Sequence, residues 1–157
     1  MQQLWAPWRI RYIKQAKQDG CFLCRKSQQA DDAVNHILIR DRTCFALLNT
    51  YPYNPGHMMI APYKHTGDLA DLAEQELTEL ILLTRRCQQL LRAVLNPDGF
   101  NIGMNFGRVA GAGLEDHLHL HIVPRWNGDT NFMPVLGDVR VIPQALDELY
   151  AELRKHL

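Results

Sequence analysis

The feature that most constrains the fold is an alternating run, His117-Leu-His-Leu-His-Ile-Val123, in which aliphatic side chains separate three histidines. Successive side chains of a β-strand point to opposite faces of its sheet. A strand over 117–123 therefore directs Leu118, Leu120 and Ile122 into a hydrophobic core and gathers three imidazoles on the other face. Because protonated imidazoles repel one another, a shared imidazole site is typical of catalysis or of metal binding.

The other hydrophobic patterns predict an α+β domain built on an antiparallel sheet. From 68 to 95, leucines recur at three- and four-residue spacings, which is typical of one long amphipathic helix. Pro143 opens a short C-terminal helix, and loops are expected over 49–56 and 107–113. Strand character is found in five apolar segments, 33–39, 44–48, 57–61, 100–106 and 117–123.

The chain has 157 residues, enough for one domain with a full core, and we expect a single domain over 1–157. Residues 1–20 form an irregular arm, in which Trp5 and Trp8 pack onto the domain, onto a second subunit or against a nucleobase, and 126–157 form a C-terminal extension. Lys and Arg together equal Asp and Glu at 17 each, so no general nucleic-acid or membrane surface is expected.

Two absences in the sequence bear on location. No apolar run reaches the length of a membrane span, and the first residues lack the apolar segment of a signal peptide. The four cysteines are few and unevenly spread, which favours reduced thiols. We therefore expect a cytoplasmic protein.

The histidine run suits nucleophilic attack on phosphorus. Neutral imidazole, with a pKa of about 6.5, is available at pH 7 and leaves readily in a second step. His119 has an imidazole on each side to donate hydrogen bonds to phosphate oxygens, and the loop 107–113 can offer backbone N–H groups. Several zinc and iron enzymes also bind metal through alternating histidines, so a metal-dependent hydrolase is a second interpretation.

The run 117–123 resembles the signature of the histidine triad (HIT) superfamily of nucleotide hydrolases and transferases. Residues 49–62 are similar to the family's first nucleotide-binding loop and strand. The stretches 4–8 and 123–132 resemble one branch, the diadenosine tetraphosphate phosphorylases (ATP adenylyltransferases). The resemblance implies a five-stranded sheet that continues across a homodimer. It also implies cleavage of adenine dinucleoside polyphosphates, with inorganic phosphate or water as acceptor; phosphoramidates or other nucleotides are alternative substrates.

The resemblance also implies roles for individual residues. His119 matches the histidine that attacks the α-phosphate, while His57 and His121 match histidines that contact the phosphate or support the nucleophile. The expected nucleotide contacts are a purine pocket of Phe22, Leu23 and Leu47, a ribose contact at Asn49, and a phosphate segment of Asn105, Gly111, Ala112 and Gly113.

One departure from the family concerns the phosphate segment. Many members carry a glutamine and a small hydroxyl residue where this chain has Gly113 and Leu114. Arg108, Arg125 and Asn131 are candidates for the missing donor. The departure also supports an alternative in which the protein binds nucleotides without catalysis.

Cys21 and Cys24 have a spacing found in metal sites and in redox pairs. No βαβ pattern precedes them, which disfavours the redox interpretation, and the sequence holds no second close pair of cysteines for a zinc ion. In cysteine-bearing members of the family the remaining ligands match His65 and His117. The resemblance thus implies a structural zinc ion at these four residues; the alternative is two unligated thiols near the purine pocket.

Overall fold

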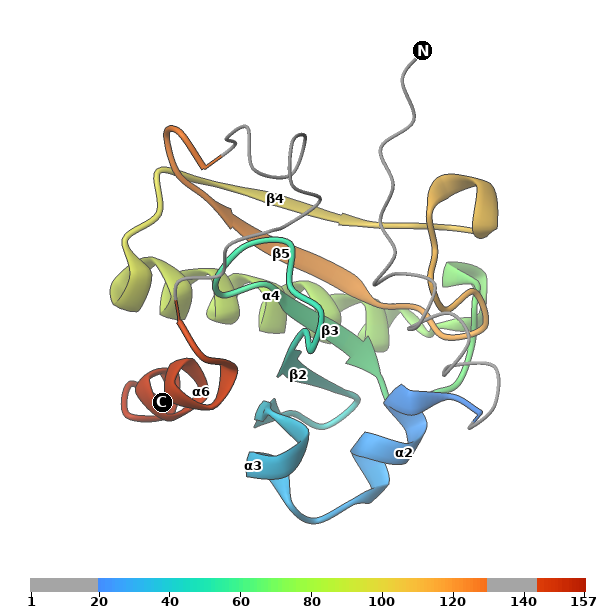
Figure 1. Cartoon of the computed structure of the whole chain (residues 1–157). Coiled ribbons are helices and arrows are strands. Elements are labelled where there is room, and N and C mark those ends of the chain that lie inside the picture. The colour runs from blue at the N-terminus through green and yellow to red at the C-terminus, as the bar shows by residue number, and fades with distance from the viewer. Residues whose placement is uncertain (1–19, 130–143) are drawn as a thin grey trace.

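In the computed structural model, residues 20–129 and 144–157 are described, and they form a five-stranded antiparallel sheet with helices on both faces (Figure 1). The strand order is β1-β2-β3-β5-β4, so β1 and β4 are the edges. The expected α+β class and antiparallel sheet are confirmed. The strands span Ile37–Arg40 (β1), Cys44–Leu48 (β2), Met58–Pro62 (β3), Gly99–Met104 (β4) and Leu120–Arg125 (β5).

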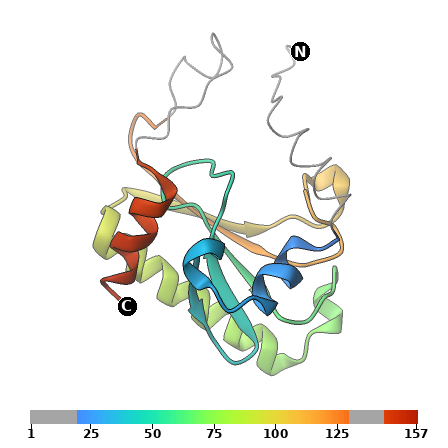
Figure 2. The same ribbon diagram turned by 60° about the horizontal axis from the view of Figure 1, so that its bottom comes forward.

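The long and the C-terminal helices expected from the sequence are both present, but the long one begins at Glu74 rather than at 68, because Leu69–Asp71 forms a separate 3-10 turn. The long helix ends at Asn96, whose φ of 45° forms a left-handed cap. Figure 2 shows the C-terminal helix, in red, beside the long one. The helices span Phe22–Gln28 (α2), Asp32–Asn35 (α3), Glu74–Leu95 (α4) and Leu146–Arg154 (α6), with 3-10 turns at Leu69–Asp71 (η1) and Arg108–Ala110 (η2).

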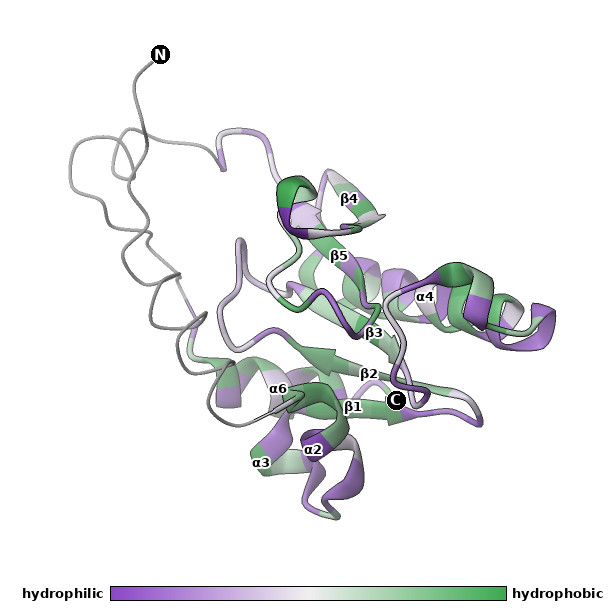
Figure 3. Cartoon of the chain, turned by 90° about the vertical axis from the view of Figure 1, so that its right-hand side faces the viewer, coloured by the Kyte–Doolittle hydropathy of each residue, from purple (hydrophilic) through white to green (hydrophobic). Residues whose placement is uncertain are grey.

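Side-chain alternation along the strands divides the hydrophobic residues into two clusters, and in Figure 3 β1 and β2 are accordingly hydrophobic along most of their length. One cluster lies between the sheet and helices α4 and α6. Its strand members include Cys44, Ala46, Leu48, Met58, Ile60, Leu120 and Ile122. The other lies on the opposite face under α2, and it consists of Leu23, Ile37, Phe45, Leu47, Met59 and Ala61.

Two expected strand starts are wrong by three residues or more, and other strand ends differ by one or two residues. The segment 33–39 begins as helix α3, because the Asp31 carboxylate accepts the Val34 N–H and caps the turn. The final strand begins at Leu120 rather than at 117, because the Leu118 N–H donates to the Thr66 carbonyl oxygen, 2.7 Å away, outside the sheet ladder. In this irregular segment Leu118 is buried, but so are His117 and His119, and Leu118 does not belong to the cluster that holds Leu120 and Ile122.

Several expectations concern residues outside the described ranges. Nearly all of the arm over 1–20, with Trp5 and Trp8, lies there, as do Asn131 and Pro143. The division of 1–157 into arm, domain and extension therefore stays a prediction. Within the described ranges, no helix combines the length and the apolar composition needed to cross a membrane.

Candidate functional site

Strands β3 and β5 are neighbours in the middle of the sheet, and their pairing assembles the site. His57 immediately precedes β3, and His65 follows shortly after that strand. Met59 pairs with His121, so the start of β3 lies beside the histidine run. The ring centroids of His57 and His121 are 5.1 Å apart, and those of His119 and His121 are 4.8 Å apart.

The three histidines of the run divide between two clusters instead of converging on one point. His119 and His121 stay together, as expected, and meet His57. His117 turns its Nδ1 atom toward Cys21, Cys24 and His65. The described residues bring together no second set of three metal-ligating side chains, which disfavours a metal held by all three histidines of the run.

The central histidine has the tautomer that a nucleophile requires. The Nδ1–H of His119 donates to the His117 carbonyl oxygen at 2.9 Å, which leaves the lone pair on Nε2. The side chain is almost completely buried, and this burial lowers the pKa of His119, although the hydrogen bond to His117 opposes the shift. The imidazole is therefore neutral at pH 7, with Nε2 available to attack.

His57 sets the tautomer of His121 through a chain of hydrogen bonds. The Tyr53 N–H donates to His57 Nδ1 at 3.1 Å, so the proton of His57 is on Nε2. That Nε2–H donates to His121 Nδ1 at 2.9 Å. His121 therefore carries its own proton on Nε2, where the ring can act as a donor next to His119. Sequence patterns could not identify the Tyr53 amide, since a backbone group has no residue signature.

Asn49 lies where the loop between β2 and β3 closes. Its N–H donates to the His57 carbonyl oxygen, and its Oδ1 accepts the Tyr51 N–H at 2.9 Å. The amide nitrogen is 3.3 Å from His57 Nδ1, which places the expected ribose contact next to the histidines. Gly56 adopts a φ of 76°, a left-handed conformation that favours glycine.

The expected purine residues come together but differ in exposure. Leu23 and Leu47 have no exposed surface and belong to the cluster under α2. Phe22 packs at the margin of this cluster and is half-buried. Of the three, Phe22 is the side chain with accessible surface for a base.

The expected phosphate segment follows β4. Asn105 is half-buried, and the chain then turns through η2, with Gly107 and Gly111 at φ 73° and 90°. Ala110, Gly111 and Ala112 donate their N–H groups to carbonyl oxygens inside this loop. These three amides therefore hold the loop in shape, and Gly113 is half-buried at its end.

Two of the candidates for the missing phosphate donor can be located. The Arg125 guanidinium donates to both carboxylate oxygens of Asp129 and to Asn101 Oδ1. It is thus engaged away from the triad, which disfavours it. Arg108 is exposed on η2, next to the phosphate segment.

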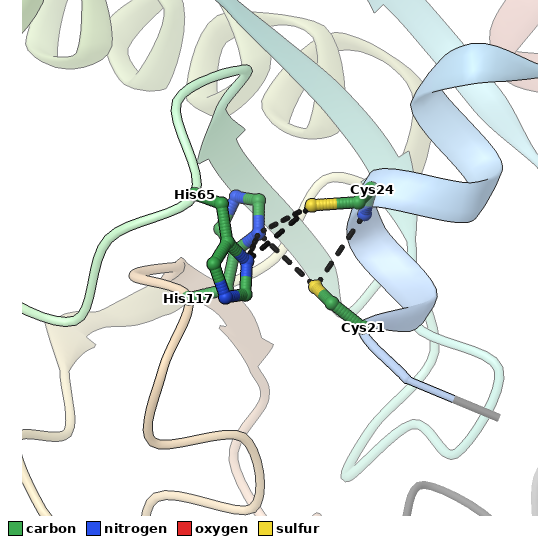
Figure 4. Close-up of side chains that lie close together, drawn as sticks. All are labelled: Cys21, Cys24, His65 and His117. Atoms are coloured by element: carbon green, nitrogen blue, oxygen red, sulfur yellow. Dashed lines mark hydrogen bonds between the residues drawn. The ribbon is translucent and has the colours of Figure 1, made fainter. Parts of the chain in front are cut away.

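The second cluster has the chemistry of a zinc site (Figure 4). Cys21 Sγ and Cys24 Sγ lie 3.1 and 3.4 Å from His117 Nδ1, and His65 Nδ1 lies 3.2 Å from the same atom. All four donor atoms are within 4.8 Å of one another. Zinc bonds of about 2.0–2.3 Å in a tetrahedron separate donor atoms by roughly 3.5 Å, so the residues fit this ion.

Surrounding contacts prepare His117 for a metal. Its Nε2–H donates to the Pro62 carbonyl oxygen at 2.8 Å, which leaves the lone pair on Nδ1. Burial raises the pKa of the Cys24 thiol to about 11, so a bound cation would have to displace its proton. The neighbouring Gly67 allows close packing, because a Cβ there would be 2.5 Å from the Glu115 carbonyl oxygen.

Comparison with known proteins gives consistent matches. A family model described as the HIT domain matches residues 30–128. An AP-4-A phosphorylase of Mycobacterium tuberculosis is 40% identical over 154 residues, covering 93% of this chain and 79% of the relative. A bis(5′-adenosyl)-triphosphatase of Dictyostelium discoideum is 33% identical over 106 residues, covering 68% and 65%. A crystal structure of a Zn-bound histidine triad family protein from Mycobacterium smegmatis has a TM-score of 0.69 and 29% identity, covering 87% and 91%.

Proposed function

This chain belongs to the HIT family, and from that premise we propose that it is an enzyme that cleaves adenine dinucleoside polyphosphates through a nucleotidyl-His119 intermediate. The observation that carries the proposal is the neutral His119, with its Nε2 lone pair beside the Nε2–H donor of His121. The names of two relatives, a phosphorylase and a triphosphatase of such compounds, support the substrate class.

In the first step, His119 Nε2 attacks the α-phosphorus, a P–N bond forms, and the P–O bond to the leaving polyphosphate breaks. His121 Nε2–H donates a hydrogen bond to the departing oxygen, which leaves as a polyphosphate anion, and His57 Nε2–H holds the His121 ring in this tautomer. In the second step an acceptor oxygen attacks phosphorus, the P–N bond breaks to release His119 as a neutral imidazole, and any proton on the acceptor oxygen passes to solvent water. In this proposal Asn49 holds the ribose, and Asn105 and the segment Gly111–Gly113 contact the phosphates.

The acceptor that we propose is inorganic phosphate, because a relative that is 40% identical and matches 93% of this chain is named a phosphorylase. Diadenosine tetraphosphate would then yield ADP and ATP, whereas water as acceptor would yield AMP and ATP. Product analysis by chromatography, with and without inorganic phosphate, separates the two. ADP that forms only in the presence of phosphate supports the phosphorylase, and AMP under both conditions contradicts it.

His119→Ala should lower kcat by at least about a thousandfold, because the covalent route is lost. It should leave the Kd for diadenosine tetraphosphate within a few-fold of the original value, measured by calorimetry. Labelling with a radioactive dinucleotide should mark the unaltered protein and not this variant. His156→Ala, an exposed histidine in the C-terminal turn, is the matched control and should label normally. Retained turnover in His119→Ala contradicts the mechanism.

We also propose that Cys21, Cys24, His65 and His117 hold a structural zinc ion. The convergent donor atoms and the Zn-bound neighbour support this assignment. The ion would supply a cross-link between three chain segments and would fix the main chain at His117, whose carbonyl oxygen sets the His119 tautomer. Metal analysis of protein purified without a histidine tag should find about one zinc per chain.

A homodimer is the assembly that we propose, formed by pairing the β4 edges of two copies. Ile102 in β4 is 45% exposed and pairs with Ile122, so it lies on the α4 side of the sheet. Ile81 and Leu82 of α4 are exposed as well. Light scattering should give a dimer, and Ile102→Asp should give a monomer. Val34→Asp, at an exposed apolar side chain away from β4, should stay dimeric.

A further inference from the structure

Two exposed tyrosines lie in the loop that connects β2 with β3. Within 20–129 and 144–157 the exposed aromatic side chains are Tyr51, Tyr53 and Phe106, at 41%, 39% and 44%. Tyr51 and Tyr53 belong to the same loop as Asn49 and His57. This loop contains no acidic or basic residue apart from His57 itself. It therefore offers aromatic faces and amide groups, which suit a flat neutral ligand better than a phosphate.

The ring of Tyr53 is directly adjacent to the reacting histidines. Its centroid is 4.6 Å from that of His57, with 33° between the planes, and 6.2 Å from that of His121, with 27° between the planes. His121 in turn lies 4.8 Å from His119. The sequence of rings thus runs from the nucleophile through His121 to Tyr53, where the aromatic surface becomes accessible. A leaving group that accepts a hydrogen bond from His121 departs from a point next to this surface.

A dinucleoside polyphosphate carries two nucleobases, and the purine pocket expected at Phe22, at the margin of the cluster under α2, would take one. Resting on the proposed function, we infer that Tyr53, together with Tyr51, forms the subsite for the second nucleobase, the one that departs with the leaving nucleotide. Stacking on an aromatic ring needs no matching hydrogen bonds, because every base has a π face. The subsite would therefore select for the presence of a second base and discriminate weakly between adenine and guanine.

The experiment compares two substrates that differ by the second nucleoside alone. Diadenosine tetraphosphate and adenosine 5′-tetraphosphate share the transferred AMP and the phosphate chain, but the second lacks the departing base. The measured quantity is the ratio of their kcat/KM values. Removal of a stacking ring weakens base binding by roughly 5- to 100-fold, so Tyr53→Ala should lower this ratio by about tenfold. Tyr53→Phe, which keeps the ring, should retain the ratio within about twofold.

The use of a ratio separates base stacking from support of the histidines. If Tyr53 merely packs against His57 and His121, Tyr53→Ala lowers both kcat/KM values equally and the ratio stays constant, which overturns the inference. Phe106→Ala is the matched control, since Phe106 is equally exposed but follows β4. A drop in the ratio for Phe106→Ala, with none for Tyr53→Ala, assigns the second base elsewhere and also overturns it.

A binding measurement keeps the inference testable if the proposed reaction is absent. Calorimetric Kd values of the same two compounds are compared in His119→Ala and in the double variant His119→Ala/Tyr53→Ala. The preference for the dinucleotide should fall about tenfold in the double variant. If the unaltered protein shows no turnover but the preference for the dinucleotide still falls in the double variant, the proposed function is contradicted and the subsite is supported. If the preference is unchanged, the subsite is contradicted.

Discussion

At the scale of single residues, hydrogen bonds that each ring makes with its neighbours decide what the histidines can do. The His117 carbonyl oxygen fixes the proton of His119 on Nδ1, and the Tyr53 amide fixes that of His57 on Nε2. The Pro62 carbonyl oxygen fixes the proton of His117 on Nε2, which leaves the Nδ1 lone pair for a metal. The three imidazoles of the run 117–121 thereby acquire three different roles: nucleophile, hydrogen-bond donor and metal ligand.

His57→Ala should lower kcat by about 10²–10⁴-fold with little change in KM, because His121 loses the donor that keeps its proton on Nε2. His57→Gln should recover part of the loss if its amide N–H reaches His121 Nδ1. Steady-state kinetics give the kcat and KM values, and ¹⁵N NMR shifts of the imidazoles report the His121 tautomer. A kcat within threefold of the original, or an unchanged tautomer, contradicts the assigned chain of hydrogen bonds.

At the scale of secondary-structure elements, side chains tie the helices to the sheet beyond hydrophobic packing. The Tyr150 hydroxyl and the Arg154 guanidinium of α6 donate to the Ile37 and Leu38 carbonyl oxygens of β1. These donors occupy the exposed edge of the sheet, where unpaired carbonyl groups would otherwise face another chain. At the other end of the fold, Glu79 of α4 accepts hydrogen bonds from Arg42 and Thr43, next to β2.

The contact between Glu79 and Arg42 predicts a specific loss of stability in acid. The Arg42 hydrogen bond is the main cause that lowers the pKa of Glu79 to about 2. Since the folded pKa is below the unfolded value of about 4.3, the stabilisation is complete above that pH and is lost as the pH falls toward 2. Urea denaturation between pH 7 and pH 2.5 should show a shallower decline for Glu79→Gln than for the unaltered protein.

The control for this measurement is Glu148→Gln, at an exposed carboxylate of α6. It should follow the pH dependence of the unaltered protein. Parallel declines for Glu79→Gln and the unaltered protein would falsify the linkage.

At the scale of the whole molecule, the Cys–His cluster joins segments that are distant in the chain. Cys21 and His117 are 96 residues apart in sequence and in contact in the fold. Such a cross-link stabilises the folded state by mass action when a metal binds it and not the unfolded chain. His117 belongs to the cluster, and its carbonyl oxygen accepts the Nδ1–H of His119. Metal binding and the orientation of His119 therefore depend on the same stretch of main chain.

Removal of zinc by a chelator should lower the thermal midpoint. At metal concentrations about a thousandfold above Kd, the ion contributes about 4 kcal/mol, or roughly 10 °C for a domain of this size. Differential scanning calorimetry with and without chelator measures the shift. Cys24→Ser should abolish the difference, whereas Cys87→Ala, at a buried cysteine outside the cluster, should retain it. Chelator insensitivity of the unaltered protein contradicts the proposed zinc site.

By itself, the sequence determined the parts of the structure that depend on local periodicity and residue chemistry. Two-residue alternation predicted the buried Leu120 and Ile122 opposite the histidines, and leucine spacing predicted α4. The motif resemblance identified the four residues that converge in the Cys–His cluster. Local patterns missed the start of β5 and the helical turn α3, where an Asp31 cap and a contact with Thr66 override strand character.

The tertiary structure alone decided which groups meet and which proton each ring carries. The pairing of β3 with β5 brings His57 to His121, and the loop after β3 brings His65 to His117. The tertiary structure also pairs Arg125 with Asp129, away from the triad, and leaves Tyr53 exposed beside the histidines. The physical reason is that a tautomer depends on the position of a single donor or acceptor within about 3 Å, which the pairing of distant segments sets and no local pattern encodes.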